Sequence, residues 1–102
     1  MKIAIASEGK DINSDISEKG GRAPYYLVFD NKELIETIKN PFAKGSGGAG
    51  FSIAYMLAEK KVDLIIAGKI GKNMESAIIE KGMKFEEGSG KISKVLKESI
   101  IN

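Results

Sequence analysis

The amino-acid sequence predicts a single α/β domain, with helices on both faces of a five-stranded mixed sheet. Three observations support this fold class. The length of 102 residues suits one domain, short apolar runs recur at strand length, and apolar stripes of helical period separate the later runs. The order β, β, β, α, β, α, β, α gives the sheet order 3-2-1-4-5, because helical crossovers join parallel strands and tight turns join antiparallel ones. The second strand then runs against the other four, and residues 1–102 form one domain.

The first part of the chain predicts three strands. Lys2–Ala6 is a short run rich in isoleucine and alanine that stops at a turn signal. Residues 11–22 are polar and end in two glycines, which indicates a loop. Tyr25–Phe29 is apolar at every position, as expected for a strand covered on both faces. A tight turn then leads into Leu34–Ile38, so we expect these two runs to form an antiparallel hairpin.

The period of the apolar pattern then changes to that of a helix. Between Phe51 and Ala58 the apolar residues recur at i, i+3, i+4 and i+7, with further apolar residues beside them. This spacing predicts a well-buried helix. Val62–Ala67 is nearly all apolar and predicts a central strand.

The last part of the chain predicts two helices with a short strand between them. Asn73 is a candidate cap for a helix that ends at Gly82. Met83–Phe85 is a short strand that we expect at the edge of the sheet. Ser89 is a candidate cap for the final helix. The apolar stripe of that helix consists of Ile92, Val95, Leu96 and Ile100.

The composition excludes several classes of function. The chain has no cysteine and no histidine, so it lacks disulfides, thiolate metal ligands and the usual general base. Its net charge of +2 is evenly spread, which argues against a nucleic-acid partner. It has no apolar run of membrane-spanning length and its first apolar run is too short for a signal peptide, so we expect a cytoplasmic protein. The lysine-rich and isoleucine-rich composition favours a thermophilic source. We find no acid–base pair and no activated nucleophile in the sequence, so we do not expect an enzyme.

The predicted topology brings glycine-rich segments together at the carboxyl edge of the sheet. Four strands point to this edge, and the second strand begins there. Ligands of open α/β sheets bind at this edge, and helix N-termini, glycines and basic side chains all favour an anion. Each glycine taken alone is also explained by a tight turn. The segments are 7–10, 20–24, 44–50, 68–73 and 88–91.

The segment 44–52 contains the dinucleotide-binding pattern GxGxxG, but its context is wrong for that function. The pattern should follow the first strand, and an acidic residue should end the next strand of the unit. Here it follows a hairpin strand, the next strand ends in Gly68–Lys69, and Asp63 lies at the opposite end of that strand. The phosphate-loop pattern also fails, because Phe51 stands where its lysine should be. A nuclease of the same sheet topology would need a carboxylate in the first strand, which has none.

Three motifs in register resemble the dinitrogenase iron-molybdenum cofactor biosynthesis family. They are Gly21–Tyr26 before an apolar strand, Gly47–Gly50 at the start of a helix, and Gly68–Asn73 after the strand that begins at Val62. The resemblance covers nearly the whole chain. It implies a small domain of ribonuclease-H-like architecture that is not an enzyme. Some members of this family carry iron–sulfur cluster precursors of the nitrogenase cofactor.

The resemblance also implies roles for individual residues. Arg22 matches the arginine of the family's GRA motif and would pair with an anionic ligand. Many members carry a histidine and an aromatic residue just before this motif, where this chain has Lys19 and Gly20. Without cysteine or histidine the usual sulfur and nitrogen ligands are absent and we name no metal-ligating residue, so an iron–sulfur or molybdenum-containing precursor would be held by carboxylates or by electrostatic attraction. The predicted ligand-binding residues are Lys19, Arg22, Gly47, Gly48, Gly50, Gly68, Gly71 and Asn73.

Two hypotheses of different classes follow. The first is a non-enzymatic binding or carrier domain for a small anionic ligand or cluster, acting with cofactor-assembly proteins. The alternative is a protein-interaction or regulatory module whose glycine loops are purely structural and which docks through an edge strand such as Met83–Phe85. In either case we expect a monomer or weak homodimer without a nucleic-acid or membrane partner.

Overall fold

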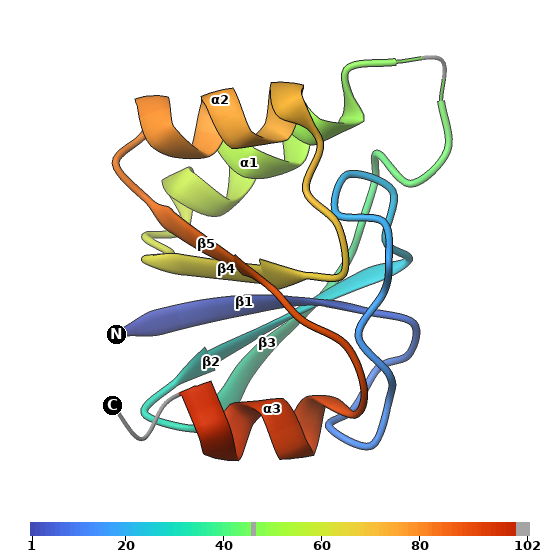
Figure 1. Cartoon of the computed structure of the whole chain (residues 1–102), viewed down its shortest axis with the longest axis vertical. Helices are drawn as coiled ribbons and strands as arrows, with labels where there is room; N and C mark the ends of the chain where they lie inside the picture. The colour runs from blue at the N-terminus through green and yellow to red at the C-terminus, as the bar shows by residue number, and fades with distance from the viewer. Residues whose placement is uncertain (46, 100–102) are drawn as a thin grey trace.

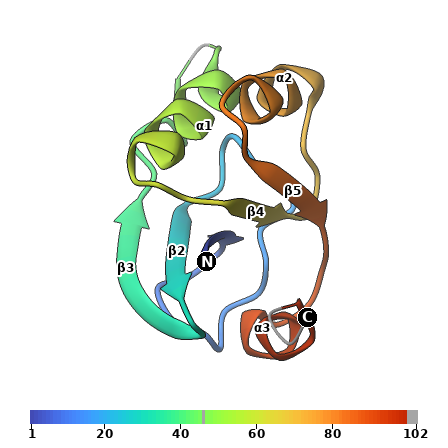
Figure 2. The same ribbon diagram turned by 90° about the vertical axis from the view of Figure 1, so that its left-hand side faces the viewer.

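The computed structural model describes residues 1–45 and 47–99 and confirms the predicted architecture. Its five strands form one sheet in the order β3-β2-β1-β4-β5. β1 pairs antiparallel with β2 and parallel with β4, so β2 opposes the other strands as predicted. Helices α1 and α2 cover one face and α3 covers the other (Figures 1 and 2). The elements are β1 (Lys2–Ser7), β2 (Tyr25–Asp30), β3 (Glu33–Lys39), α1 (Ala49–Glu59), β4 (Leu64–Ala67), α2 (Lys72–Glu80), β5 (Lys84–Glu87) and α3 (Ile92–Ser99).

The starts of α1 and β4 each differ from the sequence prediction by two residues because of local turns, whereas β3 and β5 each start within one residue of the predicted position. α1 begins at Ala49, before the predicted stripe, because Gly48 adopts a left-handed conformation with φ 74° that turns the chain into the helix. β4 begins at Leu64 and not at Val62. The Val62 amide still donates to the carbonyl of Leu57 at 3.1 Å, which closes the turn after α1.

Both predicted helix caps are wrong. α2 begins two residues earlier than expected, with Gly71 as its N-cap, because the Gly71 carbonyl accepts the first helical hydrogen bond from the Glu75 amide. Asn73 therefore lies inside the first turn. α3 does not use Ser89, since its first amides donate to loop carbonyls: Ile92 to Ser14 at 3.0 Å and Ser93 to Ile12 at 2.9 Å. These acceptors come from a distant part of the chain. Ile100, which we placed on the apolar stripe, lies outside the described residues.

The core lies on both faces of the sheet. β2 shows this directly, because Tyr26 and Val28 pack on the side of α1 and α2, whereas Leu27 and Phe29 pack on the side of α3. All four side chains are buried, which confirms the prediction of a strand covered on both faces. The edge strand β3 is exposed at every position except Ile38 and its pairing with β2 contains a bulge. None of the described helices is long and apolar enough to cross a membrane.

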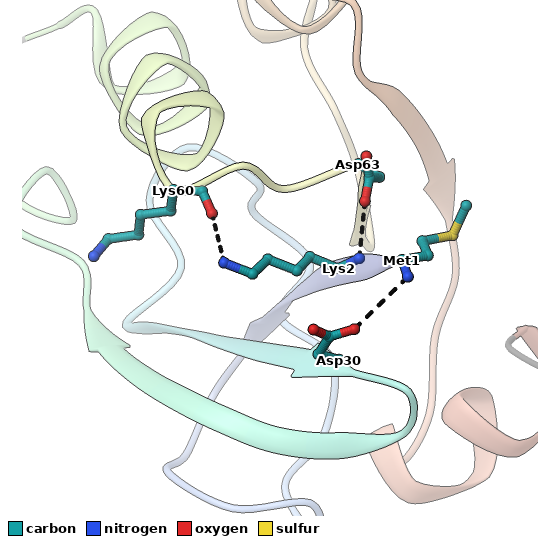
Figure 3. A network of polar contacts seen from close by, with 5 residues as sticks. All are labelled: Met1, Lys2, Asp30, Lys60 and Asp63. Carbon is teal, nitrogen blue, oxygen red and sulfur yellow. Dashed lines mark hydrogen bonds and ion pairs between the residues drawn. The ribbon is translucent and has the colours of Figure 1, made fainter.

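The amino edge of the sheet is joined by polar contacts (Figure 3). The Lys2 amide donates to Asp63 Oδ2 at 2.9 Å, and its Nζ donates to the carbonyl of Lys60 at 3.0 Å. The N-terminal ammonium of Met1 lies 3.7 Å from Asp30 Oδ1. Asp63 is thus used at the amino edge, which confirms that it cannot serve as a ribose-binding acid at the carboxyl edge.

At the carboxyl edge, a segment from the long loop is inserted between β1 and β4. Pairing of these two strands ends at Ile5 and Ile66. Beyond that point the chain places residues 16–20 between the diverging strand ends (Figure 1). Ser17 N donates to the Ala6 carbonyl at 2.9 Å and its own carbonyl accepts from Gly68 N at 2.8 Å. The loop that we predicted for residues 11–22 therefore contains a paired stretch.

This insertion requires glycine at several contacts. A Cβ on Gly68 would lie 2.5 Å from the Glu18 Cα, and one on Gly21 would lie 2.9 Å from the Gly50 amide nitrogen. Both are closer than real Cβ atoms approach backbone, so these glycines allow the segments to pack. Gly71 is different, because a Cβ there would meet nothing within 4 Å and its φ of −73° suits any residue.

We therefore expect Gly68→Ala and Gly71→Ala to differ in stability. Gly68→Ala should lower the free energy of unfolding by about 1–3 kcal/mol or more, because the new methyl group must displace the backbone of Glu18. Gly71→Ala should lower it by no more than about 1 kcal/mol, the typical cost of a poorer N-cap residue. Urea titration followed by circular dichroism measures both variants. Equal losses would show that the insertion does not constrain the fold in this way.

Candidate functional site

A cleft of about 460 Å³ opens at the carboxyl edge, where the first turns of α1 and α2 face the inserted segment. Both helices begin at this end of the molecule (Figure 1). The floor includes Met74 of α2, whose side chain is buried and packs under Gly50 and Gly20. The cleft brings together these predicted residues: Lys19, Arg22, Gly48, Gly50, Gly71 and Asn73.

Two predicted residues lie elsewhere. Gly47 precedes α1 without lining this cleft. Gly68 lines a neighbouring cleft of about 620 Å³, which shares Glu18, Lys19 and Lys69 with the first. Because Gly68 packs against the backbone of Glu18, its packing role accounts for the glycine there.

The N-termini of α1 and α2 both open into the 460 Å³ cleft. Their N-cap residues are Gly48 and Gly71, and neither helix has a side-chain cap hydrogen bond. The first amides of a helix have no partner within the helix and carry partial positive charge. α1 has no acidic residue in its first turn, whereas α2 has Glu75. The cleft is therefore lined by N–H donors from two helices.

The side chains around the cleft add positive charge. Four of the lining residues are basic and only Glu18 is acidic. Among residues 1–45 and 47–99 the ion pairs are Met1–Asp30 and Lys60–Glu36, both away from this cleft. The basic lining residues are Lys19, Arg22, Lys69 and Lys72.

Two of these basic residues are opposed. Lys19 and Lys69 are partners in an isolated parallel β-bridge, and the Gly20 amide donates to the Lys69 carbonyl at 3.0 Å. Placing them beside helix N-termini adds to the same positive potential. This arrangement would attract an anion and repel a cation.

The loop that carries Arg22 is held from beneath by two buried polar side chains. Tyr26 Oη donates to the Gly20 carbonyl at 2.6 Å. Complete burial raises the pKa of Tyr26 far above the ordinary range, so its hydroxyl remains a donor. Asn40 Nδ2 donates to the Gly21 carbonyl at 3.0 Å and to the Ala23 carbonyl at 2.9 Å.

Sequence reasoning did not include Lys69, Lys72, Tyr26 or Asn40 among the site residues. Both lysines stand within the segment 68–73 that we placed at the carboxyl edge, so their position was a usable signal. Tyr26 and Asn40 gave no such signal. Tyr26 reads as a core aromatic residue, and Asn40 as part of a turn before a proline.

The donor set suits an anion better than a metal cation. The sequence has no cysteine or histidine, and within the part of the chain that the structure describes no group of three or more acidic side chains could hold a metal ion. Thiolate or imidazole coordination of a cluster is therefore impossible within this chain. What the cleft offers is backbone N–H groups, ammonium groups and one guanidinium.

Several solved structures share this fold. The apo form of the orange protein from Desulfovibrio gigas has a TM-score of 0.89 at 24% identity, covering 98% of this chain and 87% of its own. A NifB candidate from Thermotoga, assigned to the DUF35 family, has a TM-score of 0.80 at 27% identity, covering 96% and 85%. A dinitrogenase candidate from Methanocaldococcus jannaschii has a TM-score of 0.63 at 22% identity, covering 99% and 88%.

Sequence comparison gives a family. No protein with a curated description matches the chain. A family model described as dinitrogenase iron-molybdenum cofactor matches residues 1–100. This match confirms the resemblance carried by the three glycine-containing motifs, and the chain belongs to the dinitrogenase iron-molybdenum cofactor family.

Proposed function

We propose that this protein is a non-enzymatic carrier that binds an anionic metal cluster or cofactor precursor in the 460 Å³ cleft. The observation that carries the proposal is the convergence of two helix N-termini, neither capped by a side chain, with four basic side chains around one cleft. Helix N-termini and glycine loops bind anions through backbone N–H groups. Membership of a family named for the iron-molybdenum cofactor makes a metal-containing anion the expected cargo.

The size of the cleft supports a cargo larger than a single small ion. A volume of about 460 Å³ equals that of roughly fifteen water molecules at ~30 Å³ each. It also lies in the range of small-molecule sites in proteins. Hydrogen bonds to the oxygen or sulfide atoms on the outside of a cluster would hold it without a metal–protein bond. Such binding is reversible, as delivery to another protein requires.

The first prediction concerns the basic side chains. Titration of the wild type with molybdate should move the amide resonances of residues 20–22, 48–50 and 71–73. Arg22→Ala and Lys69→Ala should each weaken binding by roughly tenfold or more, since a hydrogen bond to a charged group contributes about 1.5–3 kcal/mol. Lys84→Ala is the matched control, because Lys84 begins β5 at the opposite edge of the sheet. Removing the charge of Lys84 should change the molybdate affinity little, because salt screens charges that lie this far apart.

The same titration also defines the result that would contradict an anion site in the cleft. If molybdate, phosphate and a reconstituted iron–sulfur precursor all leave these amides unmoved, the cleft is not an anion site. Native mass spectrometry with metal analysis, on protein purified without oxygen, then distinguishes a simple anion site from a cluster carrier. A carrier should retain bound molybdenum or iron that is lost in the Arg22→Ala variant.

A second prediction uses Gly71 as a steric probe. Gly71→Val should place its side chain in the open space beside the cleft, where a Cβ meets nothing within 4 Å. We expect weaker molybdate binding, measured by calorimetry, with a loss of about 0.5–2 kcal/mol in the free energy of unfolding because valine is a poor N-cap residue. Gly48 is a poorer probe, since its φ of 74° strains any other residue. Unchanged affinity in a folded Gly71→Val protein would place the ligand elsewhere.

The edge strand β3 supports a second candidate function, a protein-interaction module. Its side chains Leu34 and Ile35 are 38% and 47% exposed on an edge of the sheet. The other edge, β5, follows the buried Met83 and carries Phe85, which packs against the core. An exposed apolar edge is a template for pairing with another chain. β3 is therefore a better docking edge than the Met83–Phe85 strand that we named from the sequence.

This candidate predicts that Leu34→Lys with Ile35→Lys abolishes a self-association or partner complex without altering molybdate binding. Sedimentation velocity and affinity capture measure the two effects. The double variant Leu34→Val with Ile35→Val is the control, because it keeps the edge apolar. A wild type that is monomeric and captures no partner removes this candidate.

A further inference from the structure

The loop before Arg22 contains two glycines that its close packing requires but that make its backbone flexible. Gly20 and Gly21 are required there, because a Cβ on Gly20 would lie 2.8 Å from Met74 Sδ and 3.0 Å from the Lys69 carbonyl, and Gly21 packs on Gly50. Two consecutive glycines, however, leave their peptide groups free to rotate. Each peptide group can then present either its N–H or its carbonyl oxygen to the cleft.

The direction of these peptide groups decides whether the cleft attracts an anion. A carbonyl oxygen carries partial negative charge and repels an anion, whereas an N–H group binds it. In this structure the carbonyls of Gly20, Gly21 and Ala23 all accept hydrogen bonds from side chains of the protein interior. These oxygens are therefore held away from the cleft that the loop lines.

We infer that Tyr26 and Asn40 are positioning residues for the anion site, an inference that rests on the proposed function. Tyr26 is 0% exposed and holds the carbonyl of Gly20. Asn40 is 4% exposed and holds the carbonyls of Gly21 and Ala23, which flank Arg22 on either side. Together they fix the peptide groups around Arg22, so that the guanidinium starts from a defined backbone position.

Hydrogen bonds to all of its polar groups fix the orientation of the Asn40 side-chain amide. Both N–H groups of Nδ2 go to the two carbonyls, and Oδ1 accepts from the Phe42 amide at 2.9 Å. If the amide were flipped, its oxygen would face two carbonyl oxygens, and two acceptors cannot form a hydrogen bond with each other. Asn40 also ties the Arg22 loop to residues 42–43, where the Ala43 carbonyl lies 3.5 Å from Arg22 Nη1. The side chain thus holds the arginine loop and its neighbour as one unit.

The test is the molybdate affinity of Tyr26→Phe. This change removes one hydroxyl and keeps the ring, so the core remains filled. We expect the Kd to rise by roughly tenfold to a hundredfold, by analogy with the loss found when an outer-shell partner that orients a metal ligand is removed. Tyr25→Phe is the matched control, since Tyr25 is the neighbouring residue on the opposite face of β2, where Lys10 lies 5.8 Å from its ring. Its Kd should equal that of the wild type.

A positioning role is separated from a merely structural one by two readouts. Binding is measured well below the melting temperature of each variant, where lost stability alone leaves the Kd unchanged. Added salt should weaken molybdate binding by the same factor in Tyr26→Phe as in the wild type, because no charge is lost, whereas the effect of salt should be smaller in Lys69→Ala. Asn40→Ala, which removes both amide donors, provides an independent second variant with the same expectation.

The outcomes are distinct. If the wild type binds molybdate and both folded variants bind it equally well, Tyr26 and Asn40 do not position the site and the inference is wrong. If the wild type binds neither molybdate nor another tested anion, the proposed function itself fails, and this inference with it. Weaker binding in Tyr26→Phe and Asn40→Ala, with Tyr25→Phe unaffected, supports the inference.

Discussion

The insertion of residues 16–20 between the ends of β1 and β4 is the constraint on which the carboxyl edge depends. In an open α/β sheet the crevice between two diverging strands is the usual place for a ligand. Here the chain fills that crevice itself, through hydrogen bonds from Ser17 to Ala6, Gly68 to Ser17 and Gly20 to Lys69. The open space is displaced towards the first turns of α1 and α2. The GxGxxG pattern of segment 44–52 follows β3 and not the first strand of a βαβ unit, so it lacks the context of a dinucleotide site.

The same insertion divides the glycines into two groups with different physical roles. Gly20, Gly21, Gly50 and Gly68 are needed because another segment lies against them. Gly71 meets no such neighbour, so packing does not explain it. The first group makes the loop compact but leaves its peptide groups free to rotate, and the side-chain donors beneath the loop offset that freedom. A site made largely from backbone N–H groups depends on this kind of support, because its binding groups have no rotamers of their own to be locked.

The sequence predicts the fold well because the fold follows from local periodicity. The apolar run Tyr25–Phe29 and the helical stripe that starts at Phe51 each identify an element, and the order of elements then fixes the sheet topology. The predicted cap at Ser89 was wrong for a physical reason. The first amides of α3 bond to carbonyls of residues 12 and 14, a long-range contact that no local pattern reveals. The composition of the cleft was foreseen in part, since topology alone brings the glycine segments and Arg22 to one edge. The supporting side chains Tyr26 and Asn40 were not foreseen, because their hydrogen bonds to the Arg22 loop form only when the chain folds.

The opposed lysines suggest how binding and stability are linked in this fold. Lys19 and Lys69 stand opposite each other across a bridge, and the nearby helix N-termini carry charge of the same sign. Both lysine side chains are exposed to solvent, so water and salt screen their charges in the free protein. A ligand that binds only the folded state stabilises it in proportion to the logarithm of its concentration. An anion held between the two lysines would therefore raise the free energy of unfolding, because it would bind only where the inserted segment lies against β4.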